Sequence, residues 1–475
     1  MKRLLTKKRV GFGLLVLLVG VIAYLGITYY PYFTQGAIGA GIRAKNLCSG
    51  IFVSGREEQN VIDEDISFHP LFDLIKLSVD YDNKEVTASI YGIIKNTAIF
   101  HHDLGAVLLS GRDAQEIRSW ATDIPPRQPK NPEEIPWPNG DLIAEVNPPA
   151  EVDMGILQSA VDQAFSDPDP DRPWRTRGVV VVHDGKLIAE KYAEGIKPDT
   201  PLIGWSMSKS VTSALVGILV GRGQLNIQDA AGFPEWSEPG DERAEITLDM
   251  LLRMSSGLKF EEAYEDSPLS DVNRMLFTKA DMGKFAADFP LEAPPDTKFS
   301  YSSGTTMLLS RLIRESFTDS LEYLSFPRKV LFNKIGMRSA VFEPDSSGTF
   351  VGASCVYASA RDWARFGLLY INDGVWEGER ILPEGWVEYS ITPSSTAERG
   401  NYGAQFWLNR GRDGAPRSIV YPDLPRDMFY CNGYQGQFVV VIPSKKLVIV
   451  RLGMTTHGSF PFARFVAGIL KSVKD

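Results

Sequence analysis

Two hairpin signals far apart in the sequence set the strongest limit on how this chain folds. Residues 179–189 are two apolar runs joined through Asp184-Gly185, and residues 437–452 are two more apolar runs joined by a short polar turn. An Asp-Gly pair between apolar runs is a strong signal for a tight β-hairpin. Residues 206–314, between the hairpins, have the apolar spacing of helices. The chain therefore predicts an α+β domain in which both ends build one antiparallel sheet, flanked by helices and interrupted by an all-helical insertion.

A long apolar stretch near the N-terminus predicts a membrane helix. Residues 1–9 carry five basic side chains, and residues 10–30 contain no charged residue. About 20 apolar residues span a bilayer, and basic residues before the span stay on the cytoplasmic side. We therefore expect residues 1–35 to form a transmembrane anchor that places the rest of the chain in the periplasm or extracellular space. A cleaved signal peptide is the alternative, although no clean cleavage site follows the stretch.

The sequence divides the rest of the chain into three parts. Residues 77–92 alternate around Asp82-Asn83 as a hairpin does, so we expect residues 36–120 to be a small accessory region that is partly β. Six prolines lie between residues 125 and 138, and such a density makes a semi-rigid connector over residues 121–150. The main domain then occupies residues 151–475. The sequence does not predict what the accessory region does.

Composition excludes several classes of function. The net charge is −9, and acidic and basic residues are interspersed without a basic stripe for nucleic acid. The five histidines and three cysteines are too scattered for a metal site, and no glycine-rich phosphate loop follows a strand. We therefore expect no cofactor, no metal and no nucleic-acid partner. Three cysteines permit one disulfide outside the cytoplasm, but the sequence decides neither the pair nor the oligomeric state.

The strongest chemical signal is a serine three residues before a lysine, Ser206 and Lys209, at the start of a long apolar run. Side chains at positions i and i+3 of a helix lie on the same face, so we expect the hydroxyl and the amine to touch. A hydroxyl needs a base to remove its proton, and burial beside apolar residues lowers the pKa of a lysine enough for this role. The pair predicts a serine hydrolase without a histidine base. An ordinary buried serine that caps the helix is the alternative.

A second serine-lysine pair tests how specific this spacing is. Ser256 and Lys259 have the same spacing, and chance alone gives about one or two such pairs in a chain of this length. Gly257 lies between them and weakens a helix, whereas Ser206 opens an apolar run. We therefore expect Ser206, not Ser256, to be the nucleophile.

A hydrolase of this kind also needs a second proton carrier, for which Tyr301 is the candidate. The motif Tyr301-Ser302-Ser303-Gly304 follows a turn-rich segment and precedes a helical run over residues 305–314. We expect the nearby lysine cation to favour the phenolate form of Tyr301. A structural tyrosine that caps the helix is the alternative.

Three motifs in this order resemble those of the penicillin-recognising serine hydrolase superfamily, which includes class C β-lactamases, D-alanyl-D-alanine carboxypeptidases and related esterases and amidases. The motifs are Ser-x-x-Lys at Ser206, Tyr-x-Ser at Tyr301, and Tyr434-Gln435-Gly436, where the family has Lys-Thr-Gly or His-x-Gly. The resemblance covers about residues 170–475. It implies the β-lactamase/transpeptidase-like fold.

The resemblance also implies a role for each matching residue. Ser206 would be the acylated nucleophile, Lys209 its base, and Tyr301 the general acid and base in acylation and deacylation. Ser303 would touch the substrate. The oxyanion of the tetrahedral intermediate would rest between the backbone N–H groups of Ser206 and Gln437.

The third motif departs from the family pattern. Tyr434, Gln435 and Gly436, followed by Gln437, would line the substrate pocket. Tyr434 and Gln435 replace cationic or hydroxyl residues that grip a substrate carboxylate in true β-lactamases, so a charge-assisted anchor is missing. A penicillin or a D-alanyl-D-alanine peptide is therefore a less suitable substrate.

A segment around Tyr264 indicates one branch of this superfamily. Residues 260–266 and 270–275 resemble the corresponding loop of the 6-aminohexanoate-dimer hydrolase and esterase branch, which hydrolyses short linear amides and carboxylic esters. Tyr264 is then a candidate for the pocket wall, with a surface-loop tyrosine as the alternative.

These observations predict a serine hydrolase that cleaves a small amide or ester through an acyl-enzyme. A true β-lactamase or D-alanyl-D-alanine carboxypeptidase is one alternative. A non-catalytic sensor, which is acylated but does not turn over, is the other. The natural substrate is not predicted.

Overall fold

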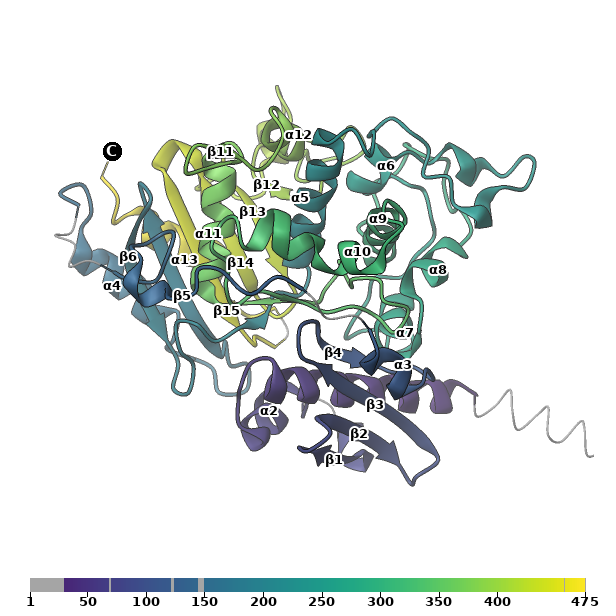
Figure 1. Cartoon of the computed structure of the whole chain (residues 1–475). Helices are drawn as coiled ribbons and strands as arrows, with labels where there is room; N and C mark the ends of the chain where they lie inside the picture. The colour runs from purple at the N-terminus through teal and green to yellow at the C-terminus, as the bar shows by residue number, and fades with distance from the viewer. Residues whose placement is uncertain (1–29, 68–69, 121–123, 144–148, 457, 475) are drawn as a thin grey trace, which may run out of the picture.

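The computed structural model describes residues 30–67, 70–120, 124–143, 149–456 and 458–474. The predicted membrane segment, residues 10–30, lies almost wholly outside these ranges. Within them, no helix is both long enough and apolar enough to cross a bilayer. Figure 1 shows two parts of unequal size, a small region formed by a long helix and the first four strands, and a larger domain around a second sheet.

The larger domain is built on a six-stranded antiparallel sheet with the strand order β12-β13-β14-β15-β5-β6. In chain order its strands are β5 (Thr176–His183), β6 (Lys186–Tyr192), β12 (Trp407–Leu408), β13 (Phe429–Gly433), β14 (Gln437–Ile442) and β15 (Leu447–Gly453). β5 with β6 and β14 with β15 are the two predicted hairpins. The prediction that both ends share one sheet is confirmed, because β15 pairs with β5.

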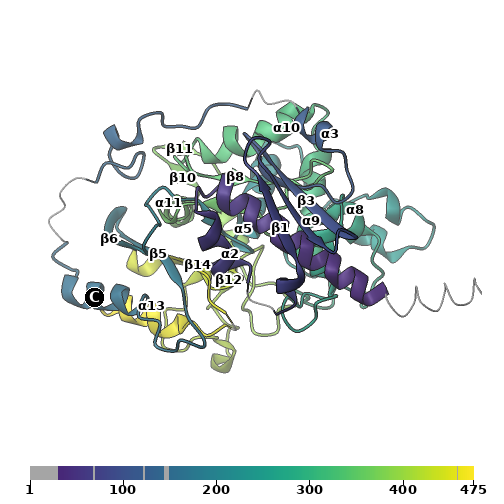
Figure 2. The ribbon, with the colours of Figure 1, turned by 90° about the horizontal axis from the view of Figure 1, so that it is seen from below.

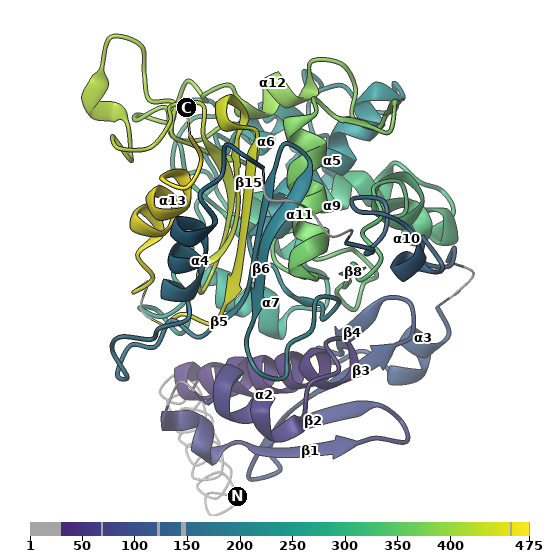
Figure 3. The same cartoon turned by 90° about the vertical axis from the view of Figure 1, so that its left-hand side faces the viewer.

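Helices cover both faces of this sheet (Figure 3). α4 (Met154–Gln163) and α13 (Phe462–Leu470) pack on one face, and α11 (Ala360–Ile371) packs on the other. Alternate valines of β5 enter the two cores, Val179 under α4 and α13 and Val180 under α11. A strand that is covered on both faces is apolar at every position. This is why β5 reads as a continuous run of valine.

The predicted helical insertion lies between two short strands, β7 (Leu202–Ile203) and β8 (Val341–Phe342). Its helices are α5 (Met207–Gly221), α6 (Leu248–Leu252), α7 (Asp271–Thr278), α8 (Met282–Ala287), α9 (Ser303–Glu315) and α10 (Ser320–Pro327). α5 is buried along nearly its whole length, as its apolar sequence predicts. β7 and β8 both pair with β9 (Val356–Ala358), which fixes the start of α5 beside the loop before β9.

The remaining elements of the larger domain lie at its edge. α12 (Trp386–Ile391) follows a two-stranded hairpin of β10 (Val375–Trp376) and β11 (Glu379–Arg380). These elements do not contribute to the site described below.

The accessory region is a four-stranded antiparallel sheet packed against a long helix. Both lie beneath the larger domain in Figures 1 and 3, and in front of it in Figure 2, which is seen from below. The described part of the helix spans residues 30–52. The other elements are α2 (Glu58–Asp65), β1 (Lys76–Asp80), β2 (Glu85–Ile90), β3 (Ile94–His101), β4 (Gly105–Leu108) and α3 (Ala114–Arg118). β1 and β2 form the predicted hairpin around residues 81–84. Ala40 and Ala44 of the helix share a buried core with Val86 of the sheet.

A buried ion pair joins the accessory region to the larger domain. Glu343, next to β8, is fully buried and pairs with Lys45 of the long helix. The same carboxylate accepts hydrogen bonds from the Ser49 hydroxyl (2.9 Å) and from the Ala106 N–H of β4 (2.7 Å). Three donors from the accessory region therefore satisfy one buried charge of the larger domain, as a buried carboxylate requires.

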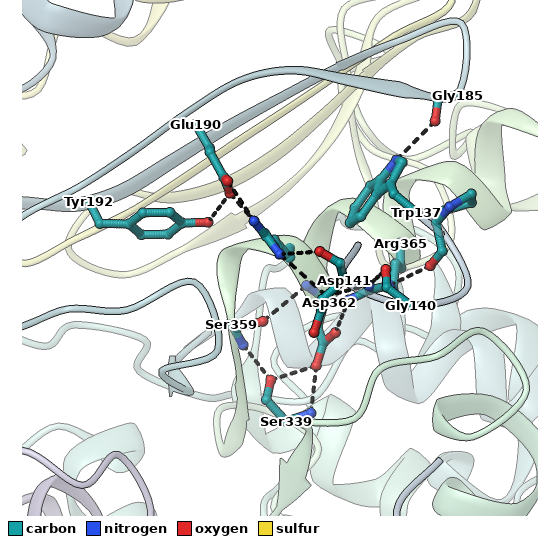
Figure 4. A network of polar contacts seen from close by, with 12 residues as sticks. Trp137, Gly140, Asp141, Gly185, Glu190, Tyr192, Ser339, Ser359, Asp362 and Arg365 are labelled. Carbon is teal, nitrogen blue, oxygen red and sulfur yellow. Dashed lines mark hydrogen bonds and ion pairs between the residues drawn. The ribbon is translucent and has the colours of Figure 1, made fainter. Parts of the chain in front are cut away.

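The proline-rich connector, described over residues 124–143, is fastened to the larger domain by arginines of α11 (Figure 4). Arg365 donates to the carbonyl oxygens of Pro138 (2.7 Å) and Gly140 (2.6 Å), and pairs with Asp141 and Asp362. Residues 132–142 form a tight loop with hydrogen bonds of its own, and the carbonyls of Pro138 and Gly140, which the loop does not use, accept from α11 instead. The connector thus follows a fixed path along the domain.

The three cysteines, all of which the structure describes, are buried free thiols. Cys48 lies on the long helix, Cys355 precedes β9 and Cys431 lies in β13. The one disulfide that the sequence permits is therefore not formed in this structure.

We predict that Lys45→Met destabilises the chain. The change leaves Glu343 buried without its cation, which costs about 3–5 kcal/mol for a buried pair. Chemical denaturation followed by tryptophan fluorescence measures the loss in the free energy of unfolding. The double variant Lys45→Met/Glu343→Leu is the control, because removing both charges together is often close to neutral. An unchanged unfolding midpoint for the single variant would contradict the prediction.

Candidate active site

Ser206 lies where the chain turns sharply into α5. The preceding residue, Trp205, has a φ of 48°, which is uncommon for a residue other than glycine. Ser206 occupies the N-cap position of α5, yet its hydroxyl makes no capping hydrogen bond. The alternative in which Ser206 serves only to cap the helix is therefore wrong.

Lys209 lies one helical turn after Ser206 and points its amine at the serine. Its Nζ is 3.0 Å from Ser206 Oγ, 2.9 Å from Ser303 Oγ and 3.0 Å from the carbonyl oxygen of Ala353. Lys209 is 1% exposed, and this burial lowers its pKa to about 8, while the charge of Glu262 acts in the opposite direction. A lysine with this pKa is about one-tenth neutral at pH 7, and the neutral amine accepts a proton.

Tyr301 lies on the other side of the nucleophile. The Ser206 side chain acts to lower the pKa of Tyr301, and the Nζ of Lys209 lies 5.0 Å from the centre of the Tyr301 ring. The ring packs against Tyr402 and Trp407 at centroid distances of 5.9 and 5.2 Å. The capping alternative for Tyr301 is wrong, because the neighbouring Ser302 caps α9 instead.

The expected phenolate form of Tyr301 is also wrong for this structure. Burial raises the pKa of Tyr301, and the negative charge of Glu262 raises it further, although the Ser206 side chain lowers it. These effects keep the hydroxyl protonated at neutral pH. Tyr301 therefore enters the site as a proton donor.

Ser303 and Glu262 extend the polar contacts of Lys209 away from the nucleophile. Ser303 is expected to touch the substrate, but its side chain is fully buried in this structure. Its hydroxyl donates to Oε1 of Glu262 (2.5 Å), and its N–H donates to Oε2 (2.7 Å). Burial raises the pKa of Glu262, and the Lys209 cation lowers it. The hydroxyl of Ser303 thus separates a carboxylate from the catalytic amine.

The sequence does not single out Glu262. It lies among several acidic residues of segment 260–266, the segment that resembles the amide-hydrolase branch, where the sequence indicates only Tyr264. Which acid of such a run is turned inward depends on tertiary packing. Glu262 is the acid that faces inward, because it accepts hydrogen bonds from Ser303, which is 41 positions away in the sequence.

Three aromatic rings stand next to the nucleophile. Tyr264 stacks on Tyr434 with ring centroids 4.9 Å apart, and both meet the edge of Trp205. The Tyr434 hydroxyl donates to Oε1 of Glu265 (2.5 Å). Both rings lie against the residue that precedes Ser206, and their contact with a substrate stays a prediction.

The other residues of the third motif have structural partners. Gln435 is buried, and its Oε1 accepts from the indole N–H of Trp205 (3.1 Å). The Gln437 side chain exchanges hydrogen bonds with the backbone of Gly453 (2.5 and 2.9 Å), so this side chain faces the sheet rather than a substrate. Only the backbone of Gln437 remains as a candidate for contact with the reacting atoms.

Arg451 binds the backbone of the turn at residues 434–436, a role that the sequence analysis does not predict. Arg451 is fully buried on β15 and donates to the carbonyl oxygen of Gly436 (2.6 Å) and, at 3.4 Å, to that of Gln435. Burial lowers its pKa to about 9. A lone arginine within an apolar strand was the available signal, because a buried cation needs a specific set of acceptors.

The second serine-lysine pair does not form a site. Ser256 is buried in a loop, with its Oγ 3.5 Å from Thr305 Oγ1, and the Lys259 side chain is exposed. Gly257 between them has a φ of 75° and is not helical. The preference for Ser206 over Ser256 agrees with this geometry.

Comparisons with known proteins identify the family. A sequence model of the Beta-lactamase family matches residues 171–467, more than half of the chain and a range that includes all three motifs. One similar protein is the 6-aminohexanoate-dimer hydrolase of Paenarthrobacter ureafaciens, which is 25% identical over 301 residues, or 58% of this chain and 72% of that protein.

Solved structures support the fold. A Bacillus anthracis protein assigned as a 6-aminohexanoate-dimer hydrolase has a TM-score of 0.54 and 22% identity, over 66% of this chain and 80% of its own. A family VIII carboxylesterase has a TM-score of 0.51 and 14% identity, over 68% of this chain and 97% of its own. At these identities the likeness is one of fold. Together with the family match, it shows that the chain belongs to the Beta-lactamase family and is a serine hydrolase with the α+β fold of that family.

Proposed function

We propose that this chain hydrolyses a small amide or ester through an acyl-enzyme formed on Ser206. The observation that carries the proposal is the buried amine of Lys209, with its pKa lowered to about 8, 3.0 Å from the Ser206 hydroxyl. A base within hydrogen-bond reach and with a pKa near neutrality is what activation of a hydroxyl nucleophile requires.

In the proposed acylation, neutral Lys209 takes the proton of Ser206 while Oγ bonds to the substrate carbonyl carbon. The tetrahedral intermediate then breaks its bond to the amine or alcohol, which leaves with a proton from the Tyr301 hydroxyl. The proton held by Lys209 restores Tyr301. Water repeats the sequence in reverse on the acyl-enzyme and releases the acid. The pKa of Tyr301, which burial raises, supports its role as the donor.

The proposed oxyanion site uses the backbone N–H groups of Ser206 and Gln437. Within the described residues, the Ser206 N–H has no hydrogen-bond acceptor. The Gln437 N–H shares a planar peptide with the Gly436 carbonyl, and in a trans peptide the two groups point in opposite directions. The bond from Arg451 to that carbonyl therefore fixes the direction of the N–H, and a charged donor on the oxygen makes the N–H a stronger donor.

We expect a small substrate that binds without a carboxylate anchor. Tyr434 and Gln435 occupy the places of the family's anion-binding residues. The Tyr434 hydroxyl is engaged with Glu265, and the Gln435 Oε1 is engaged with Trp205. The stacked rings of Tyr264 and Tyr434 provide an apolar wall. Relatives that are named as an amide hydrolase and a carboxylesterase agree with an amide or ester as the scissile group.

We also propose that the hydrolase works outside the cytoplasm on an N-terminal membrane anchor. The support is the sequence alone, namely five basic residues followed by the uncharged stretch at residues 10–30.

The first test is Ser206→Ala. We expect the loss of several orders of magnitude in the hydrolysis of p-nitrophenyl butyrate, and no mass adduct with a fluorophosphonate, because no nucleophile is left. Ser256→Ala is the matched control, since it removes the serine of the other Ser-x-x-Lys motif and should leave both readouts unchanged.

Three outcomes of this experiment would change the proposal. An adduct on the Ser206→Ala variant would show that another residue is the nucleophile. A lasting adduct on the unmodified chain without turnover of any ester would favour the sensor. Rapid hydrolysis of a penicillin would favour a true β-lactamase.

A second prediction concerns the pH dependence of the rate. An opposite charge stabilises the charged form of a lysine, so Glu262→Gln should lower the pKa of Lys209 below its value of about 8. Lys209 must be neutral to act, so kcat/KM rises with pH through this pKa, and the rise should move to lower pH in the variant. Glu261→Gln, which changes the exposed neighbour, is the control and should leave the profile in place. A shift to higher pH would refute the electrostatic role of Glu262.

A third prediction concerns Arg451. Arg451→Met removes the donor to the Gly436 carbonyl, so the oxyanion site is less well oriented and kcat should fall by about 10–1,000-fold, with KM little changed. Arg451→Lys keeps a cation and should restore part of kcat. Circular dichroism checks the fold of both variants. Equal loss in the two variants, or a change confined to KM, would contradict the orienting role.

A further inference from the structure

Exposed apolar side chains gather at one end of the accessory region. Ten large hydrophobic side chains are exposed among the described residues, and six of them belong to this small region's helix start, the segment before β1 and the β2–β3 turn. We call this set the apolar end: Tyr30, Tyr32, Phe33, Leu74, Tyr91 and Ile93. Contiguous exposed apolar groups of this kind mark interaction surfaces more often than single exposed residues do.

The fold brings these six residues together from three segments. Ile90 pairs with Ile94, so Tyr91 and Ile93 form the turn between β2 and β3. A side-chain carbon added to Gly36 would meet Ile94 at 2.8 Å and Ile90 at 3.1 Å, so the start of the long helix lies on this end of the hairpin. Lys76 pairs with Ser89, which places the segment before β1 there as well.

The figures show the same arrangement. In Figures 1 and 2 the described start of the long helix lies towards the right of the view, and one end of the small sheet lies beside that start. The opposite end of the sheet, with the β3–β4 turn, faces the larger domain through Glu343. The start of β3 also contacts the larger domain, where Asn96 donates to the Phe277 carbonyl (3.1 Å), and the apolar end lies beyond this contact.

The residues of the β2–β3 turn are not the types that are usual in solvent-exposed turns. Turns of this length favour glycine, asparagine and aspartate, yet Tyr91 is 83% exposed and Ile93 is 78% exposed on either side of Gly92. Removing side chains of this size from water is favourable. The β2–β3 turn therefore exposes two large apolar side chains to water.

The charges near the apolar end are mainly basic. Residues 30–42 and 86–96 contain no acidic residue, and Asp73, next to Leu74, is the one acidic residue of the segment before β1. Lys76 and Lys95 both pair with Ser89 in the register, so the two exposed lysines lie on the same face of the sheet just behind the turn. Apolar side chains at a tip with lysines behind them match a bilayer surface, where the lysines reach anionic headgroups and tyrosines lie at the interface.

We propose that the apolar end enters the headgroup region of a lipid bilayer, with Lys76 and Lys95 on anionic lipids, and makes the accessory region a second membrane contact beside the anchor. The proposal rests on the proposed anchor, because the uncharged stretch of residues 10–30 leads directly into Tyr30, Tyr32 and Phe33. It goes beyond that anchor, because Tyr91 and Ile93 are more than fifty positions away in the sequence. The occupant is the lipid surface, not a second protein.

The test places a fluorescent probe at the turn of the full chain in vesicles of phosphatidylcholine and phosphatidylglycerol. Ile93→Cys is labelled with an environment-sensitive fluorophore, and labelling is selective because the three native cysteines are buried. Asp82→Cys, on the exposed β1–β2 turn at the other end of the same strand pair, is the matched control. We expect a blue shift of emission and quenching by spin-labelled lipid for the probe at position 93, and neither for the probe at position 82.

Each other outcome overturns the proposal. If the chain floats with the vesicles but the probe at position 93 remains in water, the anchor stands and the second contact is wrong. If the chain does not float with the vesicles, both are wrong. If the probe shifts without lipid while the chain dimerises, the apolar end is a protein interface. Hydrolysis of p-nitrophenyl butyrate in the same samples reports the proposed catalytic function independently of all three.

Discussion

The site depends on keeping one amine, the Nζ of Lys209, out of water while giving it only uncharged groups in direct contact. A hydroxyl of the nucleophile, a second hydroxyl and a carbonyl oxygen occupy its surroundings, and the nearest carboxylate acts through Ser303. A carboxylate in direct contact would keep the lysine protonated, and full isolation would leave a buried cation without compensation. The intervening hydroxyl is a compromise between these two extremes, and it explains why a serine of the second motif faces inward.

The accessory region takes part in this arrangement through the loop before β9. Glu343, which Lys45 and Ser49 hold, donates its N–H to the Cys355 carbonyl and accepts from the Val351 N–H. The loop closed by these bonds carries Ala353, whose carbonyl oxygen accepts from Lys209. The small region is thus not an independent module beside the enzyme, because its contacts brace a backbone acceptor of the catalytic amine.

Much of the fold and the reacting groups was predictable from local sequence. Patterns within a few residues predict the hairpins at residues 179–189 and 437–452 and the buried helix after Ser206. Such patterns also indicate Ser206, Lys209 and Tyr301 as the reacting groups. Glu262, Arg451 and Glu343 were not predictable, because burial of one acid or base among many is decided by partners far along the chain. The protonation of Tyr301 was mispredicted for the same reason, since burial and Glu262 outweigh the lysine on which the sequence argument relied.

The pairing of β5 with β15 has a consequence for the order of biosynthesis. Val180 pairs with Val450, so the middle of the main sheet cannot close until the last hairpin has been made. Contacts between segments so distant in sequence form slowly, and synthesis proceeds from the N-terminus. The polypeptide therefore passes through most of its translation without its central sheet. A topology closed by its two ends leaves β5 without its main neighbour until synthesis is nearly complete.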